Sequence, residues 1–192
     1  MPSKPQEILD FWFGREDDPG YGEFRDAWFQ KNEDFDNEVQ TRFRDDYEQA
    51  ANGERDDWRD EAHSALALVI LLDQFPRNMF RGDGQTYATD AKALETAEYA
   101  IERALDRELP AFQRMFLYMP FMHSEDVGVQ RRSVEIFGQL AAEDGAPDLT
   151  SYAVGHKDIV ERFGRFPHRN AILGRETTPE EAEFLTQPGS SF

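Results

Sequence analysis

Apolar side chains recur along the chain every three or four residues, which is the spacing of one face of an α-helix. The clearest stripe is formed by apolar residues four positions apart, namely Phe35, Val39, Phe43 and Tyr47. It stops at Asn52-Gly53, a pair typical of a helix C-terminus. Strand patterns, in which apolar and polar residues alternate, are nearly absent. The pattern therefore predicts an all-α fold.

Capping residues divide the rest of the chain into further helices, about seven or eight in all. Ser3 is expected to cap the first one, with Pro5 in its opening turn and Gly14 after its end. Near the other end, Thr178-Pro179-Glu180-Glu181 has the form of a capping box for a last short helix. The helices expected between these two cover residues 58–75, 86–107, 110–119, about 124–142 and about 150–163.

Two prolines are expected to interrupt the series, because proline disfavours helical geometry in the residue before it. Pro76 should end the helix over 58–75, and Pro120 should end the short helix before it. Ser124 has the side chain of an N-cap and is expected to begin the next helix. Gly164 should end the helix that starts near Thr150.

The segment Ala65–Leu72 is apolar all round, which is typical of a helix buried at the centre of a domain. Leu68 and Leu71 are therefore expected in the core. No internal stretch has the composition of an interdomain linker. We expect one all-α domain over residues 1–192, with a loose tail at 188–192.

The charge balance is strongly acidic, with 39 acidic and 21 basic residues and a formal net charge of −18. Such a surface repels nucleic acid and anionic lipid, so we expect neither as a partner. Seventeen of the bases are arginine and four are lysine. An acid-rich, lysine-poor surface is typical of proteins that work in high salt, although G+C-rich coding also favours arginine. Adaptation to salt is therefore a hypothesis.

Several chemistries are disfavoured by what the chain lacks. It has no cysteine, so thiol catalysis and thiolate metal sites are excluded. No apolar run approaches the ~20 residues that span a bilayer, and no signal peptide is recognisable near Met1. We expect a soluble cytoplasmic protein without a membrane partner. No phosphate-binding glycine loop or dinucleotide fingerprint occurs, so no cofactor is predicted.

Two basic islands contrast with this acidic background. Arg162–Asn170 carries three arginines and His168 but no acid, and Asp73–Gly82 shares its Phe-Pro corner. Arginines beside rigid turns suit the recognition of a carboxylate or another anion. The competing interpretation is structural, because arginines also pair with carboxylates and lock segments together. The candidate ligand-binding residues in the islands are Arg77, Asn78, Arg162, Arg165, Arg169 and Asn170.

Histidines supply the candidate proton-transfer groups. His123 and His168 are the candidate catalytic residues, since an imidazole titrates near neutral pH. Glu125 and His156 are added as candidate ligand-binding residues near these motifs. Metal-ligand spacings such as HExxH are absent, so no metal site is predicted.

Several longer motifs resemble those of one known family. They are Leu72–Asn78, Met119–Asp126, His156–Glu161, Arg162–Asn170 and Ala171–Arg175. Through them, and over almost its whole length, the chain is similar to a largely bacterial domain-of-unknown-function family, number nine-two-four. The resemblance implies a tetratricopeptide-like helical superhelix. It implies no activity.

Two hypotheses about function remain open at this point. The first is a pocket for a small anionic ligand, in which arginines hold the anion and His123 or His168 transfers protons. It predicts that Arg77, His123 and Arg165 lie in one neighbourhood, far apart though they are in the sequence. The second is a helical scaffold whose concave face binds a peptide or protein partner. The residues themselves specify neither a reaction nor an oligomeric state.

Overall fold

Helices provide all the regular structure in residues 3–191, the range that the computed structural model describes. The all-α prediction is therefore confirmed. The helices are α1 (Pro5–Phe13), α2 (Glu33–Ala51), α3 (Ala62–Val69), α4 (Phe75–Met79), α5 (Asp90–Glu102), α6 (Ala111–His123), α7 (Val127–Ala141), α8 (Thr150–Phe163) and α9 (Pro179–Phe184). Short 3₁₀ turns separate several of them, and a π-helical turn, Ile70–Gln74, joins α3 to α4.

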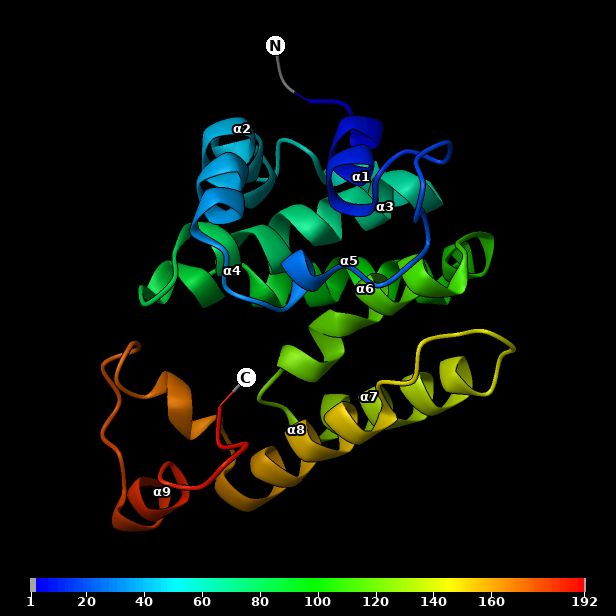
Figure 1. The fold of residues 1–192 in the computed structure, drawn as a ribbon. Coiled ribbons are helices and arrows are strands. Elements are labelled where there is room, and N and C mark those ends of the chain that lie inside the picture. The colour runs from blue at the N-terminus through cyan, green and yellow to red at the C-terminus, as the bar shows by residue number, and fades with distance from the viewer. Residues whose placement is uncertain (1–2, 192) are drawn as a thin grey trace.

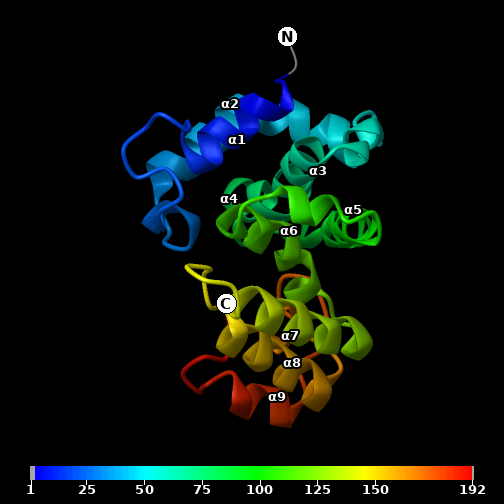
Figure 2. The same cartoon turned by 90° about the vertical axis from the view of Figure 1, so that its right-hand side faces the viewer.

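The helices are arranged in three layers (Figures 1 and 2). One end of the molecule is formed by α1 and α2, the middle by α3 to α6, and the other end by α7 to α9. The C-terminal turns of α6 connect the last two layers, since α6 packs against both α7 and α8. Within the described range, no helix has the length and apolar character needed to cross a membrane.

The core is centred on α3 and the π-helical turn, as the apolar segment predicts. Leu68 is 1% exposed and Leu71 is completely buried. Aromatic rings extend this core towards α1 and α6: the ring of Trp12 lies 5.7 Å from that of Phe75 and 5.6 Å from that of Phe116. These edge and tilted arrangements are typical of packed aromatic cores.

The two prolines do not end their helices, contrary to the prediction. Pro76 follows the π-helical turn and lies in the first turn of α4, where a missing N–H costs no helical hydrogen bond. Pro120 lies inside α6, which continues to His123. This part of α6 is buried on all sides, so tertiary packing outweighs the ~3 kcal/mol that an internal proline costs.

Two predicted N-caps are wrong by one or two residues. Lys4, not Ser3, precedes α1, and the backbone N–H of Ser3 instead donates to Asp46. Asp126, not Ser124, caps α7, and its carboxylate accepts the N–H of Val129. At α7 the carboxylate of Asp126 takes the place of the Ser124 hydroxyl, and at α1 a contact with the distant Asp46 holds Ser3. The residue types alone do not reveal either outcome.

The long helix expected over residues 86–107 is shorter than predicted. A 3₁₀ turn covers Gly84–Tyr87, and α5 itself runs only from Asp90 to Glu102. Ala104 then adopts a left-handed conformation with φ of 59°, which breaks the helix although alanine favours helices. A second 3₁₀ turn, Leu105–Glu108, follows it.

The end of α8 and the start of α9 follow the sequence pattern closely. Gly164 ends α8 with φ of 69°, and the capping box of α9 forms between Thr178 and Glu181. In the expected tail, Ser190 is 7% exposed and its hydroxyl donates to the carbonyl of Leu185. Phe192, the last residue of that tail, lies outside the described residues.

Candidate functional site

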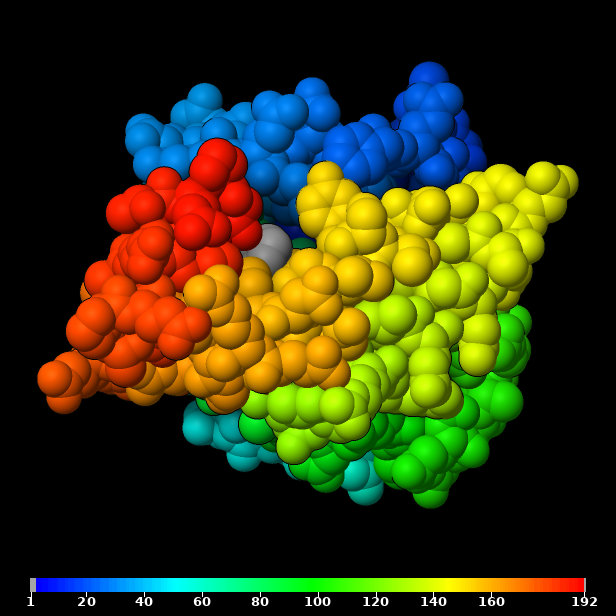
Figure 3. All heavy atoms as spheres, turned by 90° about the horizontal axis from the view of Figure 1, so that it is seen from below, coloured from blue at the N-terminus to red at the C-terminus, as the bar shows by residue number. Residues whose placement is uncertain are grey.

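A cavity of about 690 Å³ lies between the middle layer and α8. Its walls come from residues 24–29, from the π-helical turn and the chain around α4, from the end of α6, and from α8 with the turn after it. Figure 3 shows the surface hollowed where the N-terminal segment in blue, residues near 150 in yellow and orange, and the C-terminal segment in red meet. This size is typical of small-molecule sites.

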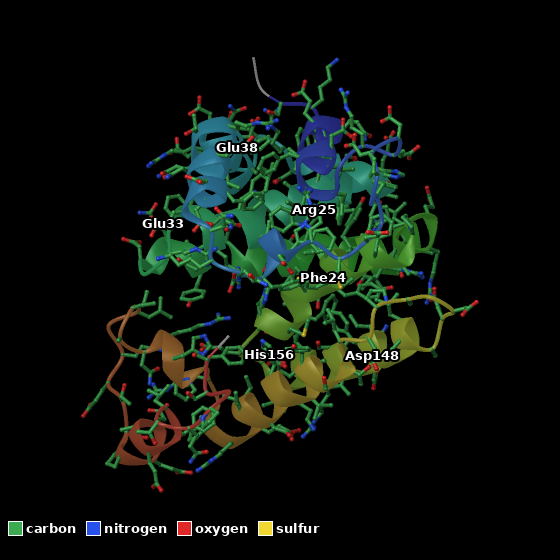
Figure 4. All side chains as sticks on the ribbon, viewed as in Figure 1. Phe24, Arg25, Glu33, Glu38, Asp148 and His156 are labelled. Atoms are coloured by element: carbon green, nitrogen blue, oxygen red, sulfur yellow. The ribbon has the colours of Figure 1, made fainter. Side chains whose placement is uncertain are left out.

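One side of the cavity is aromatic and open to solvent. Phe24, Phe29 and Tyr152 line it, and their side chains are 66%, 50% and 59% exposed. The rings of Phe24 and Phe29 stack with their centroids 5.4 Å apart. Figure 4 shows Phe24 and His156 on opposite sides of the space below the N-terminal segment. Exposed aromatic side chains gathered around a cavity mark a place where apolar surface can be buried by a ligand.

The opposite side carries two arginines that share one carboxylate. Both oxygens of Asp90 accept hydrogen bonds from Arg77, at 2.9 and 3.1 Å, and Arg169 donates to one of them at 3.1 Å. The Arg169 guanidinium also lies 4.3 Å from the ring centre of Tyr87 and 4.7 Å from that of Phe166. Both arginines line the cavity and Asp90 does not, so the guanidinium groups face the cavity and their carboxylate lies behind them.

Asp73 and His123 form a buried pair beside these arginines. Nδ1 of His123 lies 2.6 Å from Oδ1 of Asp73, and Nη1 of Arg77 lies 3.4 Å from the same oxygen. Burial opposes ionisation of Asp73, but Arg77 and His123 outweigh it and hold the pKa of this carboxyl below its ordinary value. Burial and the charge of Arg77 lower the pKa of His123, which therefore stays neutral at neutral pH.

Two further histidines face the same cavity. Burial is the main cause that lowers the pKa of His156 to about 3, and Nδ1 of this ring lies 2.8 Å from the carbonyl oxygen of Tyr152. Burial, reinforced by Arg169, lowers the pKa of His168 to about 4. All three imidazoles at the cavity are thus uncharged at neutral pH.

Six of the predicted site residues line this cavity. The predicted residues that the fold brings to the cavity are Arg77, Asn78, His123, His156, His168 and Arg169. Asn78 is already bonded, because its side-chain amide donates to Asp36 at 2.7 Å. The two basic islands and the His123 turn therefore converge, although they lie far apart in the sequence.

The other predicted residues do not line the cavity; they fasten the C-terminal segment. Arg165 donates two hydrogen bonds to the buried carboxylate of Glu181, at 2.6 and 2.9 Å, and Asn170 donates to the same group. Arg162 pairs with Glu180 at the surface. The left-handed Gly164 and the turn at 167–169 reverse the chain here, so Arg165 and Arg169 diverge. Arg165 consequently does not join Arg77 and His123.

Glu125 has a structural partner too. Arg175 donates to both of its carboxylate oxygens, at 2.7 and 2.9 Å, and the backbone N–H of Phe166 donates a third hydrogen bond. This carboxylate ties the start of α7 to the chain after α8. It therefore supports the cavity wall from behind and makes no part of its surface.

Several residues of the site are absent from the sequence-based candidates. The sequence pattern predicts only an amphipathic helix in the region that contains Tyr87 and Asp90. Phe24 lies in a loop, and Phe29 lies at the edge of that loop. For Asp73 the sequence does indicate a buried partner, because an acid at the end of an all-apolar helix must be paired inside the fold. For the others, residue type and spacing carry no comparable signal.

No group of three or more histidine, aspartate or glutamate side chains in the described range is arranged to hold a metal ion. The chemistry that the cavity offers is set by the side chains of its wall. They offer an aromatic surface, two fixed guanidinium groups and a histidine oriented by a carboxylate.

Known proteins share the sequence and fold of this chain, but their descriptions name no activity. A family profile described as a bacterial protein of unknown function, DUF924, matches residues 8–189. A solved structure, a protein of unknown function called ATU0120 from Agrobacterium tumefaciens, is 45% identical in sequence with a TM-score of 0.83. The alignment covers 94% of this chain and 96% of that one. No curated protein matches the chain.

Proposed function

The chain belongs to DUF924, a bacterial family of unknown function, and we propose that it binds a small organic anion with an apolar body in the cavity beside Arg169. The apolar body would lie against Phe24, Phe29 and Tyr152. The anionic group would face Arg77 and Arg169. Small-molecule sites commonly combine a mostly apolar wall with a few convergent polar groups.

The charge of the cavity wall is the observation that carries this proposal. The chain has 39 acidic residues and a net charge of −18, yet no aspartate or glutamate is among the described residues that line the cavity. Three arginines and three histidines do line it, with Arg81 as the third arginine. An acidic protein that keeps one concave surface free of carboxylates presents a local attraction for anions.

A pair of matched arginine variants tests the proposal. The probe is anilinonaphthalene sulfonate, a fluorescent anion with an aromatic body, displaced by hexanoate. Arg169→Gln should weaken binding by about tenfold or more, because a charge-assisted hydrogen bond contributes roughly 1.5–3 kcal/mol. Arg165→Gln comes from the same island but pairs with Glu181, so it should lower stability and leave probe affinity unchanged.

The two variants are compared at a temperature where circular dichroism shows both to be folded. Leu173→Ala serves as a second control, since Leu173 is an exposed apolar residue outside the cavity wall. Equal probe affinity in Arg169→Gln and Arg165→Gln would remove the arginine pair from the binding site. Failure of hexanoate to displace the probe from the wild type would contradict the whole proposal.

A scaffold that binds a peptide is the second candidate, and the exposed aromatic rim favours it. Phe24 and Tyr152 present more than half of their side chains to solvent beside the cavity. This candidate includes a tetratricopeptide-like arrangement of the helices. The packing of α6 on α7 and of α7 on α8 in succession supports such an arrangement. Under it, Tyr152→Ala should weaken capture from a peptide library, while Arg169→Gln should have no effect.

A further inference from the structure

The buried carboxylate of Asp73 occupies an unusual place in the core. It lies in the π-helical turn after the apolar helix α3 and is completely buried. Burying an ionised carboxylate costs several kcal/mol, and a buried ion pair returns little of that as net stability. Groups of this kind concentrate at functional sites, and so do single π-helical turns.

Local contacts hold this carboxylate in one orientation. The side-chain amide of Gln74 donates to Oδ2 at 2.5 Å, which leaves Oδ1 for His123. Arg77 donates to the backbone carbonyl of Asp73 at 2.6 Å and also anchors Asp90. The carboxylate therefore points at the end of α6 and has no freedom to turn away from it.

The pair fixes the tautomer of His123. An ionised carboxylate only accepts hydrogen bonds, so Nδ1 of the imidazole must carry the proton that it shares with Asp73. The other ring nitrogen, Nε2, then holds a lone pair, and no partner for it occurs among the described residues. The side chain is 16% exposed and lines the cavity, so this lone pair is available to a bound molecule.

The end of α6 that carries the imidazole is also fixed. The carbonyl of His123 accepts a hydrogen bond from Arg169 at 3.0 Å. Gln130, from α7, donates to the carbonyls of Met122 and Ser124 on either side of it, at 2.7 and 2.6 Å. Backbone and ring are both held, which is the preorganisation that proton transfer requires.

Charged and titratable groups surround the imidazole from every packed element. Asp73 and Arg77 come from the π-helical turn and α4, Asp90 from α5, His156 from α8, and Arg169 from the turn after it. The ring of His156 lies 6.4 Å from that of His123. Burial and Arg77 lower the pKa of His123 and Asp73 opposes them, so the ring is unprotonated at neutral pH and can accept a proton.

We propose that His123 is a general base towards a molecule bound in the cavity and that Asp73 is the residue that positions it. This inference rests on the proposed ligand-binding function, because the bound molecule must bring an acidic C–H or O–H group to Nε2. The proton passes to Nε2 and the bonding electron pair stays with the molecule. Asp73 stabilises the imidazolium ion, and Arg169 stabilises the anion that is left.

A probe reaction tests this directly without knowledge of the natural substrate. Nitrobenzisoxazole is an aromatic molecule that a single base converts to a coloured cyanonitrophenolate. The base removes the ring C–H proton, the C–H electron pair completes a C≡N triple bond, and the N–O bond breaks with its pair on oxygen. The product is an organic anion with an aromatic body, the class proposed to bind here.

Three variants separate the roles of the residues. The wild type should show saturable turnover, and His123→Gln should lose about a hundredfold, the usual contribution of a general base. Asp73→Asn should lose at least about tenfold by favouring the wrong tautomer. His63→Gln, an exposed histidine outside the cavity, should keep the wild-type rate. The rate should rise with pH and then reach a plateau. The midpoint of the rise should lie below 6.5, the ordinary pKa of histidine.

A second measurement uses only the wild type, so it does not depend on whether the variants fold. Nitrogen NMR of the wild-type histidines should show a protonated Nδ1 and an unprotonated Nε2 at His123. A proton on Nε2, or turnover in the wild type no faster than that of free imidazole, would overturn the inference. If anilinonaphthalene sulfonate still binds in that case, the general base fails and the proposed binding function stands. If the probe does not bind, the binding function itself has failed.

Discussion

Arg165 and Arg169 are four residues apart in the same basic island, yet they bind different carboxylates. Arg165 is engaged with Glu181 of α9, and hydrogen bonds from Arg165 are the main cause that lowers the pKa of Glu181 to about 2. Arg169 faces the cavity and Asp90. At the scale of single residues, role is thus set by the direction of the side chain and not by residue type.

Leu68 provides the test of packing at this scale. It is 1% exposed in α3, so Leu68→Ala should lower the free energy of unfolding by ~2–5 kcal/mol through lost burial and a residual cavity. Denaturant unfolding measures it. Leu173→Ala, at an exposed position, should change stability by less than about 0.5 kcal/mol. Similar losses in both variants would contradict the burial of α3 at the centre of the fold.

At the scale of elements, neighbouring side chains decide where each helix begins and how long it runs. Pro120 is tolerated within α6 because that segment is enclosed by packed helices. The π-helical turn lets the chain pass from α3 to α4 in spite of Pro76, and it places Asp73 opposite His123. A helix that would stop as an isolated peptide continues in the folded protein and forms one wall of the cavity.

The N-terminus of α7 gives the test at this scale. Asp126 caps the helix through Val129, whereas the hydroxyl of Ser124 only accepts the N–H of Asp126. Asp126→Ala should therefore cost about 1 kcal/mol, and Ser124→Ala should cost clearly less. Chemical denaturation of both variants measures the difference. A larger loss in Ser124→Ala would show that the cap lies at the serine.

For the whole molecule, the cavity depends on segments that are distant in the sequence. Residues 24–29, the region around α4, the end of α6 and α8 each contribute one part of its wall. No two successive elements form it alone. The ion pairs of Arg165 with Glu181 and of Arg175 with Glu125 hold the C-terminal segment against the rest and so keep this wall in place.

The histidines at the cavity should make stability depend on pH. His156 and His168 have pKa values of about 3 and about 4 in the folded protein, below the ordinary 6.5. A lowered pKa means that the unfolded chain binds protons first as the pH falls below 6.5. Stability is therefore full above that value and is lost on acidification, by about 2–4 kcal/mol between pH 7 and pH 5.

Denaturant unfolding at a series of pH values measures this loss. The double variant His156→Gln, His168→Gln should lose most of the dependence in this window, because the carboxylates with lowered pKa values act at lower pH. His63→Gln should retain the full dependence, since His63 is exposed. A wild-type stability that stays constant from pH 7 to about pH 5 would contradict the neutral state of these rings in the folded protein.

The sequence alone determined the class of the fold, the buried segment Ala65–Leu72 and the two basic islands. Periodicity and composition suffice for these, because burial of apolar faces is the largest local demand on a helical chain. Only the tertiary structure decided that Arg77, His123 and Arg169 meet in one cavity while Arg165 does not. That outcome depends on chain reversal at Gly164 and on competition among carboxylates, and neither is encoded in spacing along the chain.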